Sequence, residues 1–203
     1  MTIKNTPVKI IDMTNRKKIM TIKNLILSAS VLLLCMAIVA HSSGLMLPVP
    51  GEPKANDFTL MSADGGEISL QDYRGKFVLV NFWATWCPPC VKEMPALNSL
   101  HNQLKSRNFG VVGVHVGPAL ATVKQYLNDR PVDFDIVIDK NMSLASWEVA
   151  GLPTTFLVNP AGEIIYRATG EREWDSAEMV EFLESIMAGH ERIAQIDAAI
   201  DKF

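Results

Sequence analysis

Two cysteines three positions apart, Cys87 and Cys90, stand where the residue pattern of the chain changes. The seven residues before them, 77–83, are almost continuously apolar and rich in strand formers. After them, apolar residues recur at helical spacing, at Val91, Met94, Leu97, Leu100 and Leu104. The pattern therefore predicts a strand followed directly by a helix, with Cys87 at the first turn of that helix.

The predicted position of Cys87 has a chemical consequence. The first turn of a helix has free backbone N–H groups and the positive end of the helix dipole, and both favour an anion. The Cys87 thiol is therefore expected to ionise more readily than a free thiol. A thiolate at this position can attack a disulfide, and the Cys90 thiol can then resolve the mixed disulfide that forms.

Two other uses of a Cys-x-x-Cys pair are disfavoured. A zinc site needs further ligands, but the chain has no second cysteine pair and its histidines are scattered at positions 41, 101, 115 and 190. We therefore predict no metal site. A purely structural disulfide would close a very short loop, so it would remove little chain entropy and would be a poor staple.

Residues 82–90, Phe-Trp-Ala-Thr-Trp-Cys-Pro-Pro-Cys, resemble the active site of thioredoxin-fold proteins. With Glu93 and Pro95 the pattern becomes Cys-x-x-Cys-x-x-Glu-x-Pro, which is similar to the TlpA/ResA/CcmG group of extracytoplasmic thiol–disulfide oxidoreductases. The resemblance covers residues from about 58 to about 187. It implies an α/β fold of the thioredoxin-like three-layer α/β/α type, with a central mixed sheet and an added N-terminal β-hairpin. It implies no cofactor.

The resemblance assigns roles to individual residues. Cys87 is the expected nucleophile and Cys90 the resolving thiol, and the pair forms the redox disulfide. Glu93 matches the active-site glutamate of the family and is expected to act with the dithiol, whereas an exposed surface glutamate is the alternative. A second motif, Gly-Leu-Pro-Thr-Thr-Phe at 151–156, resembles the segment that carries the cis-proline of the family, here Pro153.

Further residues border the predicted site. Trp86, Pro88 and Pro89 flank the cysteines and are expected to contribute to the surface on which partner proteins dock. Asn81 stands where thioredoxin, which this chain resembles, has a buried Asp that relays protons, and an Asn cannot titrate. His115 falls in or just after a predicted strand and is interpreted as a core residue outside the site.

Strand and helix patterns continue on both sides of the cysteine pair. A hairpin is expected over 57–69, a helical turn over 70–73, strands over 111–116 and 135–138, and helices from Pro118 to about 128 and over 143–149. A second hairpin over 154–169 precedes a last helix with a capping box at Asp175 and Glu178. The alternation of strands and helices predicts parallel pairing through crossovers.

The start of the chain reads as a targeting segment. The first forty residues hold six Lys/Arg and one Asp, and residues 25–40 carry no charge. A basic stretch before an apolar run is typical of a signal peptide or membrane anchor, predicted here over 20–44. The positive-inside rule then places the body in the periplasm or another extracytoplasmic space. Met-Thr-Ile-Lys-Asn opens the chain and recurs from Met20, so residues 1–19 are interpreted as an upstream extension.

The rest of the chain divides by composition. Residues 45–56 are rich in Pro and Gly and are predicted to be a linker. Residues 57–188 are predicted to be the thioredoxin-like domain, and 189–203 a polar tail without an assigned role. The part after residue 40 holds thirteen Lys/Arg and twenty-one Asp/Glu, and this acidic balance argues against a nucleic-acid partner. A monomer is expected.

The resemblance implies a function in disulfide reduction. The expected clients are disulfides of selected exported proteins such as apocytochrome c, and the expected electron donor is a membrane thiol transporter. A peroxidase on the same fold is one alternative, but it needs a single activated cysteine after a Pro/Thr pattern that is absent at Cys87. A copper-handling protein is another, and it needs His or Met ligands that are not evident near Cys87. A docking module with an incidental disulfide is the third.

Overall fold

A mixed sheet of eight strands lies at the centre of the computed structural model, which describes residues 45–142 and 146–200. The strands are β1 (Leu47–Pro48), β2 (Thr59–Ser62), β3 (Glu67–Ser69), β4 (Phe77–Trp83), β5 (Phe109–Val116), β6 (Asp135–Asp139), β7 (Thr154–Val158) and β8 (Ile164–Thr169). The helices are the 3-10 helix η1 (Leu70–Tyr73) and the α-helices α2 (Pro88–Leu104), α3 (Leu120–Asp129) and α4 (Ala177–Ile200). The predicted extension 1–19 and the predicted targeting segment 20–44 lie outside the described residues.

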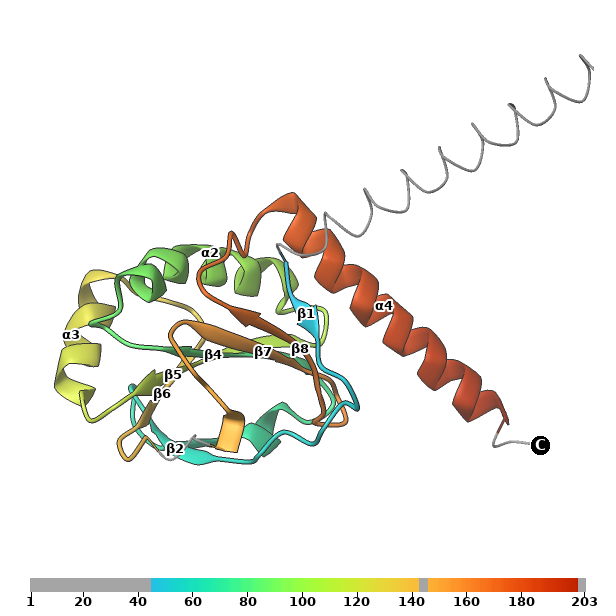
Figure 1. Ribbon diagram of the computed structural model, residues 1–203, viewed down its shortest axis with the longest axis horizontal. Helices are drawn as coiled ribbons and strands as arrows, with labels where there is room; N and C mark the ends of the chain where they lie inside the picture. Colours follow the sequence, from blue (N-terminus) through green and yellow to red (C-terminus); the bar gives the residue numbers. More distant parts are fainter. Residues whose placement is uncertain (1–44, 143–145, 201–203) are drawn as a thin grey trace, which may run out of the picture. The chain divides into compact units, whose positions relative to one another are not determined.

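The sheet has the order β1-β8-β7-β4-β5-β6-β2-β3, with β4 near its middle (Figure 1). β4 pairs in parallel with β5, and β5 pairs in parallel with β6, so α2 and α3 are the predicted crossovers. β7 runs antiparallel to β4 and to β8, which confirms the second hairpin. The first hairpin, β2 and β3, extends the sheet beyond β6.

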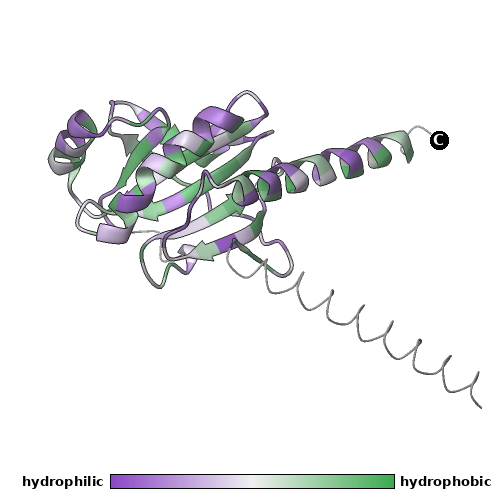
Figure 2. Ribbon diagram, turned by 90° about the horizontal axis from the view of Figure 1, so that it is seen from above, coloured by the Kyte–Doolittle hydropathy of each residue, from purple (hydrophilic) through white to green (hydrophobic). Residues whose placement is uncertain are grey.

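All seven residues of β4 are buried because both faces of the sheet are covered. Side chains from α2, α3 and α4 share one core cluster with alternate residues of the sheet. The cluster includes Leu79 of the sheet and the helix residues Met94, Leu97, Val123, Met179 and Leu183. The opposite face packs against η1, the first hairpin and Trp147. Figure 2 shows the strands of the sheet as mostly apolar and the helices as mixed in polar and apolar residues.

The expected thioredoxin-like α/β fold with a mixed sheet is confirmed. The second helical layer of the predicted α/β/α arrangement is much reduced in the described residues. The face of the sheet opposite α2 is covered by the single turn η1 and by a one-turn 3-10 segment at Ser146 and Trp147. The predicted helix over 143–149 lies partly outside the described residues.

The segment expected to be a linker lies against the domain. β1 pairs with β8 at the edge of the sheet, and Met46 is buried in the core. Lys54 forms an isolated bridge with Glu163. A Pro-rich stretch can do this because an edge strand needs backbone partners on one side only.

Two helix boundaries differ from the prediction. α3 begins at Leu120 and not at Pro118. α4 begins at Ala177, with the Ser176 hydroxyl accepting from the Met179 amide, so the cap is Ser176 and not the predicted box at Asp175. α4 also continues through Gly189 to Ile200, where the sequence pattern indicated only a polar tail. Within the described ranges, no helix combines the length and the apolar character needed to cross a membrane.

Candidate active site

The junction between β4 and α2 holds the two cysteines in a disulfide. Cys87 is the N-cap of α2, and its Cα atom lies 5.3 Å from that of Cys90. Cys87 is 5 % exposed and Cys90 is fully buried, so a partner molecule reaches the sulfur of Cys87 first. The helical pattern and the cysteine spacing predicted this placement.

Few backbone donors face the Cys87 sulfur. Pro88 and Pro89 occupy the first positions of α2 and have no N–H group. The next amide, that of Cys90, points to Cys87 Sγ at 3.4 Å. The helix start therefore offers this sulfur one direct amide donor from the three residues that follow it.

Glu93 lies on the buried face of α2, one turn beyond Cys90. Glu93 is 3 % exposed, which excludes the exposed surface glutamate that was the alternative. Asn81 Nδ2 donates to Oε1 at 2.9 Å. The other oxygen, Oε2, accepts from Trp174 Nε1 at 3.0 Å and from the Arg172 amide at 3.1 Å.

Burial raises the pKa of Glu93 to about 7, because the charged form loses its hydration. The donors from Trp174, Asn81 and Arg172 act in the opposite direction, since each stabilises the carboxylate. The result is a carboxyl group that can take up or release a proton near neutral pH. A group of this kind beside a dithiol is suited to proton transfer.

Asn81 links the carboxyl group to the strand that follows Pro153. Its Nδ2 also donates to Thr155 Oγ1 at 2.9 Å, across the antiparallel pair of β4 and β7. The Leu152–Pro153 peptide bond is cis, as the resemblance implied. The structure thus connects the two sequence motifs, one on α2 and one at the start of β7, through buried polar side chains.

The chain also matches known proteins. A family model described as "AhpC/TSA family" matches residues 52–167. This chain belongs to the AhpC/TSA family. Among relatives, thiol-disulfide oxidoreductase ResA of Bacillus subtilis (strain 168) is 38 % identical over 117 residues, which cover 57 % of this chain and 65 % of that protein. ResA of Geobacillus kaustophilus is 40 % identical over 133 residues, 65 % of this chain and 75 % of the relative.

Solved structures of similar proteins agree with this assignment. A thiol:disulfide interchange protein from Chlorobium tepidum TLS superimposes with a TM-score of 0.59 at 27 % identity, over 66 % of this chain and 97 % of that one. StoA from Bacillus subtilis gives a TM-score of 0.55 at 26 % identity, over 64 % and 99 %. With its close Cys87–Cys90 pair, this AhpC/TSA family member is a thiol–disulfide oxidoreductase of thioredoxin fold.

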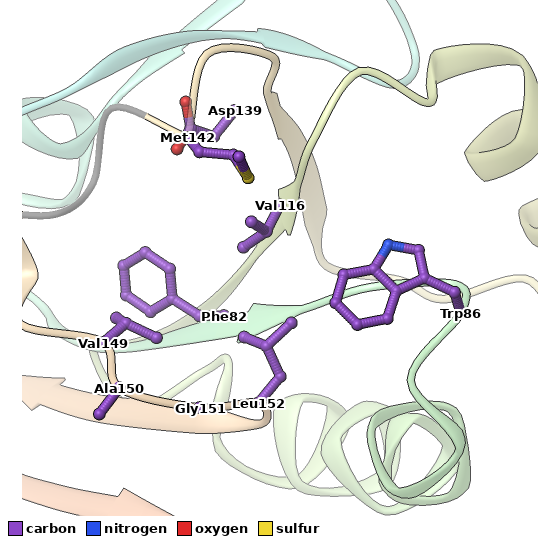
Figure 3. A pocket seen from close by; sticks show the side chains of 9 residues that line it. All are labelled: Phe82, Trp86, Val116, Asp139, Met142, Val149, Ala150, Gly151 and Leu152. Atoms are coloured by element: carbon purple, nitrogen blue, oxygen red, sulfur yellow. The ribbon is translucent and has the colours of Figure 1, made fainter.

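A pocket of about 320 Å³ adjoins Trp86, the residue before Cys87. Its walls are mostly apolar and come from Phe82, Trp86, Val116, Asp139, Met142, Val149, Ala150, Gly151 and Leu152 (Figure 3). Trp86 precedes Cys87 and is 69 % exposed, while Leu152 precedes Pro153. The pocket therefore lies between the predicted docking residue Trp86 and the cis-proline loop.

His115 lies outside the dithiol network, as expected. It is fully buried in β5, and its Nε2 accepts from the Thr85 amide at 3.1 Å. Burial lowers the pKa of His115. Through the bond from the Thr85 amide, His115 fixes the loop that leads to Cys87. In the part of the chain that the structure describes, no group of three or more His, Cys, Asp or Glu could hold a metal ion.

Sequence reasoning missed three residues of the Glu93 network. Thr155 was part of a quoted motif but had no role, and Arg172 and Trp174 lie in a loop without a recognised pattern. One signal was available for Trp174, because tryptophan is highly buried on average and this one stands among the charged residues 171–175. It is fully buried.

Proposed function

We propose that the protein works outside the cytoplasm and reduces disulfides of selected exported proteins, such as apocytochrome c. The single observation that carries the proposal is the Cys87–Cys90 disulfide at the start of α2, with Cys87 as the more accessible sulfur. The basic and apolar segments before residue 41 support the location. The relatives named thiol-disulfide oxidoreductase ResA support the exchange of thiols and disulfides.

The exchange follows from the positions of the two thiols. The Cys87 thiolate attacks the client disulfide, forms a mixed disulfide and releases the first client thiolate. Cys90 then loses its proton, and its thiolate attacks Cys87 Sγ. This step forms the Cys87–Cys90 disulfide and releases the second client thiolate. Two electrons pass from the dithiol to the client, and we propose that Glu93 accepts the Cys90 proton.

Docking of the client would use the surface beside the dithiol. The backbone next to Pro153 can pair with an extended client segment, as an added strand does. The apolar pocket between Trp86 and Leu152 supports contact with an apolar side chain of the client. In this proposal the protein acts as a monomer, and a membrane thiol transporter returns it to the dithiol state.

The start of α2 supports electron flow from this protein to its client. A strongly oxidising dithiol protein needs a strongly stabilised thiolate. Pro88 and Pro89 withhold two amide donors from Cys87, and a Glu93 carboxylate adds negative charge nearby. Both effects make the thiolate less stable and the disulfide harder to reduce. We therefore propose that the protein acts as a reductant of its clients.

Deletion of the gene in its native host tests the client. We expect a loss of holo-cytochromes c that dithiothreitol in the growth medium restores, because the added thiol replaces the missing reductant. Haem staining of membrane proteins measures the outcome, and a Cys87→Ser allele should behave like the deletion. A normal cytochrome c content, or a loss that added thiol does not restore, would exclude apocytochrome c as the client.

A further inference from the structure

Two groups of the loop between β8 and α4 donate hydrogen bonds to one oxygen of Glu93. Trp174 Nε1 donates to Glu93 Oε2 at 3.0 Å, and the Arg172 amide donates to the same atom at 3.1 Å. Trp174 is fully buried. Among the residues that the structure describes, the opposite oxygen, Oε1, has one donor, Asn81 Nδ2. The two oxygens of this carboxyl group therefore have different surroundings.

The loop itself is fixed by the Arg172 side chain. Its Nε donates to the Leu45 carbonyl at 2.9 Å, and its Nη1 donates to the carbonyls of Gly170 and Glu171 at 3.2 and 2.8 Å. These bonds tie the loop to the first described residues of the chain and restrict where the Arg172 amide can point. The indole of Trp174 is held in the core cluster under α2 and α4.

The donor set decides which oxygen of the neutral acid can carry a proton. An indole N–H and a backbone amide are donors only. A hydroxyl at Oε2 would direct its hydrogen toward the Trp174 indole and the Arg172 amide, which cannot accept it. Oε2 must therefore remain an acceptor. Oε1 faces an amide side chain whose Oδ1 has no hydrogen-bond partner among the described residues. A turn of the Asn81 amide would bring that oxygen to accept from a hydroxyl at Oε1.

We propose that Trp174 is a positioning residue of the dithiol site, which together with the Arg172 amide reserves Glu93 Oε2 as an acceptor and directs the acidic proton to Oε1. This inference rests on the proposed exchange function only for the role of that proton in turnover. Asn81 of β4 and Trp174 of the loop face Glu93, and Thr155 of β7 contacts Asn81. None of these three side chains titrates in this range. Arg172 is the charged neighbour that acts on the carboxyl group, and the reduced thiols of α2 join it during turnover.

Substitution of Trp174 by Phe tests the proposal, because the ring is kept and the donor is lost. We expect the Glu93 carboxyl to titrate about one pH unit higher in Trp174→Phe, since one donor that favours the ionised form is missing. The readout is the ¹³C chemical shift of the Glu93 carboxyl carbon of the oxidised protein against pH. This readout needs no client and no turnover, so failure of the proposed function leaves it unaffected.

Trp147→Phe is the matched control. Trp147 is a second buried tryptophan, on the opposite face of the sheet, and its Nε1 has no hydrogen-bond partner among the residues described. The substitution loses the same volume, and we expect it to leave the Glu93 titration unchanged. In a Glu93→Gln background, Trp174→Phe should add no further change to the pH profile of thiol alkylation. Equal Glu93 titration in Trp174→Phe and the unaltered protein would overturn the proposal.

The unaltered protein gives a second test that does not depend on the folding of a variant. The Trp174 indole N–H resonance should move with pH at the same midpoint as the Glu93 carboxyl carbon, because both report one hydrogen bond. The Trp147 indole resonance should not follow that midpoint. A Trp174 resonance that ignores the Glu93 titration would contradict the proposed contact.

Discussion

A Cys90→Ser variant is expected to accumulate mixed disulfides with client proteins, whereas Cys87→Ser should form none and lose turnover completely. The reason is accessibility and position. Cys87 is the more exposed sulfur at the start of α2, and Cys90 is fully buried one turn further on. Cys87 can therefore attack without Cys90, but the mixed disulfide then has no thiol to resolve it. Non-reducing gels of cell extracts, with and without dithiothreitol, measure the trapped species.

The double variant Cys87→Ser/Cys90→Ser controls for non-covalent association. Equal trapping by the two single variants would contradict the assignment of nucleophile and resolving thiol. The Cys90→Ser variant also tests the peroxidase alternative, because it leaves a single cysteine at the head of a helix. Rapid consumption of hydrogen peroxide by this variant would favour that alternative over disulfide exchange.

Glu93→Gln is expected to move the pH profile of thiol alkylation in the reduced protein to lower pH, by about one unit. A carboxylate beside two thiols disfavours their ionisation, and glutamine carries no charge. The side-chain amide of Asn81 can rotate and accept from the new glutamine amide, because Asn81 Oδ1 has no partner among the described residues. Glu173→Gln removes an exposed carboxylate of the nearby loop and should leave the profile unchanged. An unaltered profile in Glu93→Gln would remove Glu93 from the site.

The same substitution should change how the stability of the oxidised protein depends on pH. Glu93 has a pKa of about 7 in the folded chain against an ordinary 4.5, so the folded state holds the proton more tightly. The stability that the neutral group contributes is fully present below pH 4.5 and is lost as the pH rises through 7. The decrease amounts to roughly 3 kcal/mol at most. Urea unfolding at several pH values should show it in the unaltered protein and not in Glu93→Gln.

Much of the fold could be predicted because its signals are local. The apolar run of β4, the helical spacing on α2 and the turn between β7 and β8 each lie within a few residues of sequence. The two cysteines and Pro153 belong to compact motifs, so their resemblance could be recognised directly. The placement of Asn81 followed from its distance to Cys87 along a single strand and loop.

The remaining features depend on contacts between distant segments. Trp174 meets Glu93 across 81 positions of sequence, and no local pattern in the loop points to that contact. The segment 45–56 joins the sheet edge through backbone hydrogen bonds, which depend little on side-chain pattern. α4 continues through Gly189 because one glycine costs a helix only about 1 kcal/mol. Such a cost does not end a helix whose preceding turns pack on the core.

The central claim, that this dithiol works as a reductant, is tested most directly by its reduction potential. Thioredoxin lies near −270 mV and the strong oxidant DsbA near about −120 mV. Pro88 and Pro89 leave Cys87 Sγ with the Cys90 amide as its near donor, and the Glu93 carboxyl adds negative charge when ionised. We therefore expect a value below about −180 mV when the purified domain is equilibrated with glutathione buffers. A value near that of DsbA would contradict the account and make the protein an oxidant.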